Sequence, residues 1–126
     1  MELLHKEITE QILKAFYKVY NTLGYGFLEK VYENALFYEL TEIGLKCERQ
    51  KPIKVKYKCY NVGDYYADLV VEGFVIVEIK AAEMIAEEHE FQLINYLKAT
   101  DIEVGLLLNF GKEPQFKRKV FTNKSA

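Results

Sequence analysis

The spacing of the hydrophobic residues in this 126-residue chain changes at Pro52, and that change constrains the fold more than any other feature. Before Pro52, apolar residues recur every three or four positions in two segments, 3–20 and 27–43, which predicts two amphipathic helices. After it, apolar and polar residues alternate over 53–60, as they do in a half-buried strand. Such a chain is expected to pack helices against a sheet.

The remaining segments also have clear patterns. We expect strands at 65–71, 74–80 and 104–110, a helix at 85–99 and a last edge strand at 116–121. The first two of these strands are separated by Glu72-Gly73 and should form a hairpin. Because a helical crossover then leads to another strand, the order predicts an α/β sandwich with a mixed central sheet flanked by helices.

Length and composition fit a single globular domain over residues 1–126. The chain is 50% hydrophobic and 29% charged with only 2 Pro and 7 Gly, which excludes disordered and collagen-like classes. No apolar run approaches the roughly twenty residues that crossing a bilayer requires, so we expect no membrane partner. Acids stand near the N-terminus where a signal peptide has a basic region, and we therefore expect a cytoplasmic protein.

Basic residues gather in two segments, although the net charge of −2 gives the whole molecule no bulk attraction for nucleic acid. In the predicted strand 53–60, Lys54, Lys56 and Lys58 share one face. Two interpretations of this face remain open: the lysines protect an exposed sheet edge from pairing, or they bind phosphate groups of a substrate. We interpret the second cluster, in the tail after residue 111, as a solvated face.

Three charged residues interrupt segments that should be buried: Asp68, Glu78 and Lys80. Glu78 and Lys80 share a strand face and could form a simple salt bridge. Asp68 joins them only if the hairpin loop has an odd number of residues, whereas a two-residue turn would put it on the opposite face. We predict an odd loop with Gly73 left-handed, because two separately buried carboxylates would need two sets of partners.

Two neighbouring carboxylates raise each other's pKa unless a cation lies between them. Mg²⁺ usually takes one or two protein carboxylates and completes its shell with water and phosphate oxygens. We therefore expect Asp68 and Glu78 to bind Mg²⁺ or Mn²⁺. Lys80 would position or deprotonate an attacking water, or stabilise charge on a phosphate.

On the predicted helix 85–99, His89, Gln92 and Tyr96 lie on one narrow face. Such a set can hydrogen-bond a phosphate or a metal-bound water. The alternatives are that Tyr96 is a core aromatic residue and that His89 lies on the helix surface. Glu39 lies near the middle of the apolar stripe of the second helix, where it needs a partner, and we expect Arg49 or Lys80.

A motif in this chain resembles the core motif of the PD-(D/E)xK nuclease superfamily: Asp68 is followed, after nine residues, by Glu78-Ile79-Lys80. Within it, Gly26-Phe-Leu-Glu29-Lys-Val-Tyr32 is similar to the signature of the small GxxExxY proteins. Further matches are Glu48-Arg-Gln50, Tyr66-Ala-Asp68, Val77-Glu-Ile-Lys80, His89-Glu-Phe-Gln92-Leu-Ile-Asn-Tyr96 and Gly105-Leu-Leu-Leu-Asn109-Phe. The resemblance runs from about residue 5 to 120, with Ala67 standing where the motif has Pro.

The resemblance implies a restriction-endonuclease-like fold and a metal-dependent nuclease, with DNA as the expected substrate. It implies that Glu29 is a further acid beside the metal and that the backbone carbonyl of Ile79 is a ligand. It also favours catalytic roles for Gln92 and Tyr96, which form a QxxxY spacing. From the residues alone, Glu29 could instead be an exposed first-turn acid that the helix dipole favours.

Two other interpretations remain open. The chain could be a catalytically silent module on the nuclease fold that binds nucleic acid or a protein. It could also be a structural homodimer in which the basic strand pairs with its two-fold mate and the charged cluster forms a salt-bridged core.

Overall fold

Three helices and five strands form between residues 4 and 122, the part of the chain that the computed structural model describes. In chain order they are α1 (Lys6–Leu23), α2 (Glu29–Glu42), β1 (Cys47–Tyr57), β2 (Tyr60–Val71), β3 (Val75–Lys80), α3 (Glu87–Lys98), β4 (Val104–Phe110) and β5 (Pro114–Val120). The helices lie within a few residues of the segments expected from apolar spacing. None of the described helices has the length and apolar character needed to cross a bilayer.

The strands form one sheet in the order β1-β2-β3-β4-β5. All neighbours are antiparallel except β3 and β4, which run parallel because α3 connects them as a crossover. The predicted mixed sheet is thereby confirmed, as is the position of 104–110 as a strand that is buried along its whole length. β1 and β5 are the two edges, as expected for the C-terminal strand.

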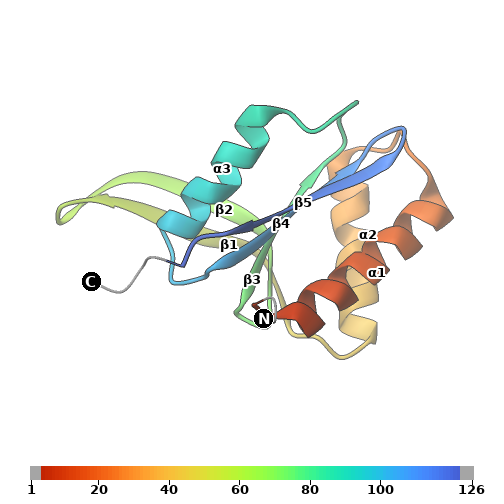
Figure 1. The fold of residues 1–126 in the computed structure, drawn as a ribbon, viewed down its shortest axis with the longest axis horizontal. Coiled ribbons are helices and arrows are strands. Elements are labelled where there is room, and N and C mark those ends of the chain that lie inside the picture. The colour runs from red at the N-terminus through yellow and green to blue at the C-terminus, as the bar shows by residue number, and fades with distance from the viewer. Residues whose placement is uncertain (1–3, 123–126) are drawn as a thin grey trace.

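The sheet lies between two helical layers: α1 and α2 cover one face and α3 covers the other (Figure 1). Alternation along β3 divides the two cores. Val75, Val77 and Ile79 pack with α1 and α2, whereas Ile76 packs with α3. Glu78 follows Ile76 by two positions and so belongs to the face that α3 covers.

A close approach between α3 and β4 depends on Gly105. A Cβ added there would lie 2.6 Å from Leu93 Cδ1 and 3.0 Å from its Cγ, so any larger residue would have to displace the Leu93 side chain. Leu93 is fully buried in the core beneath α3. This contact sets the depth of the helix that carries Gln92 and Tyr96.

The region around residue 58 differs from the expectation of two separate strands. β1 and β2 form one long hairpin with Lys58 and Cys59 at its turn, and Tyr57 pairs with Tyr60. Lys58 has a left-handed φ of 57°, so the expectation that it continues the strand was wrong. The tip of this hairpin projects beyond the helical layers (Figure 1). β1 is an edge strand, which also explains how it accommodates Pro52.

Candidate active site

The turn between β2 and β3 decides where the acids point. Val71 pairs with Val75, so the turn has three residues, Glu72, Gly73 and Phe74. Glu72 and Gly73 both have a left-handed φ, of 56° and 71°. The prediction of an odd loop with a left-handed Gly73 is confirmed, although Phe74, and not Gly73, completes the turn.

This register puts Asp68 opposite Glu78, and the two strands exchange side-chain hydrogen bonds there. The Asp68 amide donates to Glu78 Oε2 over 2.9 Å, and the Ile79 amide donates to Asp68 Oδ2 over 2.8 Å. The regular β2–β3 ladder ends one step earlier, at Leu69 and Val77. Each carboxylate is therefore held by the backbone of the other strand.

Both acids are shielded from water, Asp68 only in part, and the charge of Lys80 lowers the pKa of each without forming an ion pair with either. Glu78 is only 4% exposed, and neither acid takes part in any ion pair within residues 4–122. Burial, together with the charge of Asp68, raises the pKa of Glu78 to about 8. Burial also raises the pKa of Asp68, although the hydrogen bond from the Ile79 amide opposes this shift. The pair is thus a place where added positive charge would be stabilising.

The donor set fits a small hard cation. Among residues 4–122, no three His, Cys, Asp or Glu side chains gather closely enough to hold an ion by themselves. Mg²⁺ needs only one or two protein carboxylates, because waters and phosphate oxygens fill its other positions. Within the same residues, Arg118 Nε is the one side-chain nitrogen or oxygen that is sealed from solvent and has no hydrogen-bond partner. The hydrogen bond from Asp68 uses Glu78 Oε2, so Glu78 Oε1, which is not such a sealed atom, keeps contact with solvent.

Glu33, which the sequence analysis did not select, is the third acid of this region. It is 4% exposed and accepts hydrogen bonds from Lys30 Nζ at 3.1 Å, Arg49 Nη2 at 3.3 Å and Gln50 Nε2 at 2.9 Å. Gln50 Nε2 also lies 3.4 Å from Asp68 Oδ1. Gln50 therefore connects the buried acid of α2 to the acid pair of the sheet.

An irregularity in β1 makes this connection. Arg49 pairs with Leu69 and Lys51 with Ala67, which puts Gln50 opposite Asp68. Gln50 has a left-handed φ of 48°, which interrupts the usual alternation of side chains. As a result, the consecutive side chains of Arg49 and Gln50 both reach Glu33.

Glu29 is the first residue of α2 and is exposed. With Glu33 and Asp68 it lines a cavity of about 570 Å³. Tyr32 fixes the loop before it: its hydroxyl donates to the Gly24 carbonyl over 2.7 Å and accepts from the Phe27 amide over 3.2 Å. The motif that carries Glu29 thus sets where α2 begins beside Asp68.

Lys80 ends β3 on the same face as Glu78 and forms no ion pair with any described residue. The chain that follows it is clamped by Asn109, which is fully buried at the end of β4. The Ala82 amide donates to Asn109 Oδ1 over 2.9 Å, and Asn109 Nδ2 donates to the Ala82 carbonyl over 3.0 Å. Asn109 therefore fixes the path of the backbone that leaves Lys80.

A family model described as the PD-(D/E)XK nuclease superfamily matches residues 6–120, which includes every acid of this region and Lys80. The chain belongs to the PD-(D/E)XK nuclease superfamily. The match is at the level of the superfamily, so the GxxExxY group remains a resemblance.

A solved structure described as "Crystal structure of SSO0001" is similar to the fold, with a TM-score of 0.55 and 17% sequence identity. The match covers 93% of this chain and 60% of that chain, so this protein spans less than two thirds of the length of that chain. At this identity the likeness concerns the fold alone. A comparison with curated proteins gives no significant match.

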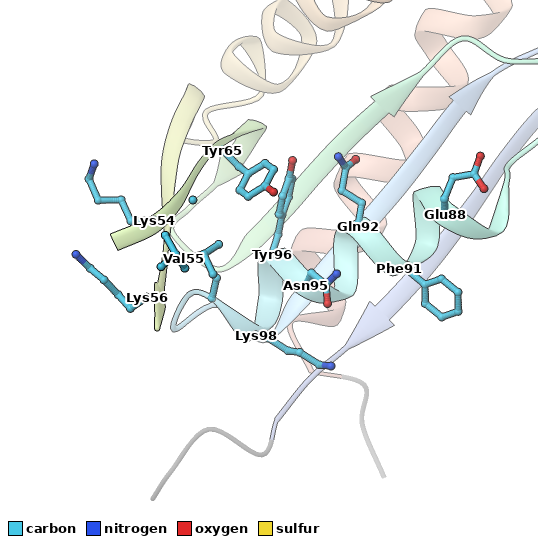
Figure 2. A pocket seen from close by; sticks show the side chains of 13 residues that line it. Lys54, Val55, Lys56, Tyr65, Glu88, Phe91, Gln92, Asn95, Tyr96 and Lys98 are labelled. Atoms are coloured by element: carbon cyan, nitrogen blue, oxygen red, sulfur yellow. The ribbon is translucent and has the colours of Figure 1, made fainter. Parts of the chain in front are cut away.

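Two further residues of the superfamily resemblance, Gln92 and Tyr96, lie in a groove of about 740 Å³ between α3 and the β1–β2 hairpin (Figure 2). Burial raises the pKa of Tyr96 to about 12, and the charges of Glu78 and Asp68 add to this shift. Tyr96 therefore lies within electrostatic reach of the acid pair. Its ring is 5.7 Å from that of Tyr65, centroid to centroid.

The predicted substrate-binding residues are found in different surroundings. Lys54 and Lys56 line the groove, but Lys54 Nζ lies 3.0 Å from Asp64 Oδ1. Lys58 lies at the hairpin turn, with its Nζ 5.6 Å from the centre of the Tyr57 ring. The interpretation of these residues as edge protection fits the place of β1 at the sheet edge, and binding of substrate stays a prediction.

His89 stabilises the start of α3. The Ala86 amide donates to His89 Nδ1 over 3.1 Å, and the His89 amide donates to the Ala86 carbonyl over 3.0 Å. This structural contact uses one ring nitrogen, so a contact with substrate would have to come from Nε2.

Glu39 has a different partner from those expected. Its Oε1 lies 3.1 Å from Lys18 Nζ on α1, so the assignment to Arg49 or Lys80 was wrong. The buried stripe of α2 runs through Tyr32, Leu36 and Leu40. This stripe leaves Glu39 partly exposed between the two helices.

Proposed function

We propose that this protein hydrolyses phosphodiester bonds of DNA with Mg²⁺ or Mn²⁺ as cofactor. The observation that carries the proposal is the reciprocal pair of Asp68 and Glu78. Glu78 is buried, Asp68 is partly buried, and neither forms an ion pair with a described residue. Membership of a nuclease superfamily supports the same chemistry. The motif with Gly26, Glu29 and Tyr32 supports assignment to the GxxExxY group.

Asp68 and Glu78 would hold the ion, with Glu29 and the backbone carbonyl of Ile79 as further ligands. When bound, such an ion lowers the pKa of a water and stabilises negative charge on the phosphate. Lys80, on the same strand face, would hydrogen-bond the attacking water or a phosphate oxygen.

Tyr96 and Gln92 would contact the phosphate from α3. The Tyr96 hydroxyl is protonated at neutral pH and can donate a hydrogen bond, and its pKa, raised to about 12, keeps it so well into the alkaline range. Glu33 and Gln50 act through Asp68 and are positioning residues: they hold its carboxylate in place through the 3.4 Å contact with Gln50.

A cleavage assay with purified protein tests this proposal. Wild type is expected to cleave DNA with Mg²⁺ or Mn²⁺ and not with EDTA. Glu78→Ala should lose at least about a hundredfold in rate, as is usual when an electrostatic partner of the transition state is removed. Glu42→Ala, an exposed acid at the end of α2, is the matched control. An active wild type with an equally active Glu78→Ala would remove the assignment.

Calorimetry separates the proposal from the silent binding module. Titration with Mn²⁺ should give binding in wild type and none in Asp68→Asn. If wild type binds no metal, cleaves nothing and still binds DNA in a salt-sensitive manner through Lys54, Lys56 and Lys58, the silent module is the better account. The homodimer through edge strand β1 also stays a prediction, which light scattering tests.

A further inference from the structure

The groove between α3 and the β1–β2 hairpin is lined more by aromatic rings and amides than by charge. Tyr65 comes from the hairpin and points toward Tyr96 of α3, and Phe91, Gln92 and Asn95 follow along the same helix (Figure 2). Side chains of this kind offer flat apolar surfaces together with hydrogen-bond donors and acceptors. They match the faces and edges of nucleobases.

Tyr96 relates the groove to the acid pair. It lines the groove and packs in the same core as Ile76, which precedes Glu78 by two positions on the face of β3 that α3 covers. The charges of Glu78 and Asp68 also raise the pKa of Tyr96. A strand whose scissile phosphate lay at the acids would therefore pass its neighbouring nucleotides over Tyr96 and along α3.

The aromatic residues of the groove keep much of their surface in water. Phe91 is 58% exposed and Tyr65 is 47% exposed. Bases inside a duplex are stacked on each other and cannot offer their faces to such rings, whereas bases of a single strand can. The rings therefore favour unpaired nucleotides.

The charged residues of the groove also favour a single strand over a duplex. Lys54 is paired with Asp64, and Glu88 lies in the α3 wall with Lys98, opposite Lys56 of the hairpin. The ammonium ends of Lys54 and Lys56 extend away from α3, toward the outer side of the hairpin (Figure 2). Binding a duplex through phosphates alone needs many unpaired cations on one surface, and these walls offer few.

Resting on the proposed nuclease function, we infer that this groove binds the bases of a single-stranded DNA segment next to the scissile phosphate. Phe91 and Tyr65 stack with bases, and Asn95 hydrogen-bonds base edges. Lys98, on α3, contacts the phosphates.

Fluorescence anisotropy in EDTA tests the inference, since no metal-dependent cleavage occurs there. The probes are a labelled single-stranded oligonucleotide, its duplex and an abasic strand of equal length. We expect the single strand to bind at least about fivefold more tightly than the other two, because stacking contributes about 1–3 kcal/mol per base. Equal or tighter binding of the duplex or the abasic strand would overturn the inference.

Variants assign the effect to the groove. Phe91→Ala should weaken single-strand binding about tenfold, whereas Phe91→Trp should retain it. The matched control is Tyr38→Ala, which removes a 60% exposed aromatic residue from α2. A loss in Phe91→Ala no larger than in Tyr38→Ala would contradict the inference.

The same proteins are assayed for cleavage with Mg²⁺, which keeps the two proposals apart. If DNA is cleaved but strandedness and Phe91 have no effect on binding, only the groove inference fails. If nothing is cleaved while the single-strand preference and its dependence on Phe91 persist, only the nuclease proposal fails.

Discussion

Asp68 and Glu78 are bound crosswise: the amide of Asp68 donates to the Glu78 carboxylate, and the Asp68 carboxylate accepts from the amide of the residue after Glu78. The two side chains thus replace the ladder hydrogen bonds that would otherwise follow Leu69 and Val77. Each acid is oriented by a strand other than its own. Removing either side chain therefore frees an amide on the neighbouring strand, while the other carboxylate keeps its own backbone donor.

The first prediction concerns pH and stability without metal. Glu78 keeps its proton up to a pKa of about 8 in the folded protein, against 4.5 for the ordinary group. Between these values the native state holds more protons than the unfolded state, so stability falls as pH rises. The raised pKa of Asp68 adds to this fall. We expect a loss of up to about 1.4 kcal/mol per pH unit from Glu78.

Urea denaturation in EDTA from about pH 5 to about pH 8 measures this slope. Glu78→Gln carries no titratable proton and should give a flatter profile. Saturating Mn²⁺ should flatten the wild-type profile too, because a bound cation keeps the carboxylates ionised. A wild-type profile that is flat without metal would contradict the buried-acid geometry.

The second prediction separates Glu33 from Glu29. Glu33→Gln brings an amide against three donors and should lower the free energy of unfolding by about 1–3 kcal/mol, with reduced cleavage. Glu29→Gln, at an exposed site, should change stability by less than about 0.5 kcal/mol but raise the Mg²⁺ concentration needed for cleavage. Chemical denaturation and metal titration of activity measure both. Equal stability of the two variants would argue against the buried network.

The third prediction concerns the clamp after Lys80. Asn109→Leu keeps the side-chain size but removes both hydrogen bonds to Ala82, and should cost about 1–3 kcal/mol. Because the clamp fixes the chain near Lys80, kcat should fall while KM for DNA changes little. Gln115→Leu, on the exposed strand paired with Asn109, is the control. A change in KM alone would show that the clamp does not act through Lys80.

The fourth prediction concerns the depth of α3. Gly105→Ala puts a methyl group 2.6 Å from Leu93 Cδ1 and should destabilise the fold by about 1–3 kcal/mol. Leu93→Ala alone leaves a cavity and also destabilises. The double variant should lose less free energy of unfolding than the sum of the losses in the two single variants. A double-mutant cycle by denaturation measures this difference. Strict additivity would mean that the two residues do not share this space.

Sequence patterns predicted the sheet and the acid pair because both depend on strong local signals. The buried run 104–110 is continuous, and the odd turn follows from the cost of burying two carboxylates apart. The long β1–β2 hairpin was missed because its turn, Lys58-Cys59, lacks the usual Gly or Asn, although Lys58 adopts the left-handed conformation that those residues favour.

Glu33 was missed because the sequence favoured another face of α2. Leu28 and Ile43 lie in the segment 27–43 whose apolar spacing predicted this helix, yet they are 80% and 54% exposed. Glu33 has helical spacing with Leu36 and Leu40, and that signal could have identified it. The choice between the two faces depends on packing against α1 and the sheet, and on the left-handed Gln50, which no local pattern reveals.

The three-residue turn after β2 has a consequence for how relatives of this chain can diverge. One inserted or deleted residue between Val71 and Val75 would invert β3 relative to β2, so that Asp68 and Glu78 would face opposite layers. Replacing Glu72 or Phe74 leaves the facing unchanged. Relatives can therefore replace the residues of this turn. They can change its length only by two residues at a time if Asp68 and Glu78 are to stay on the same side.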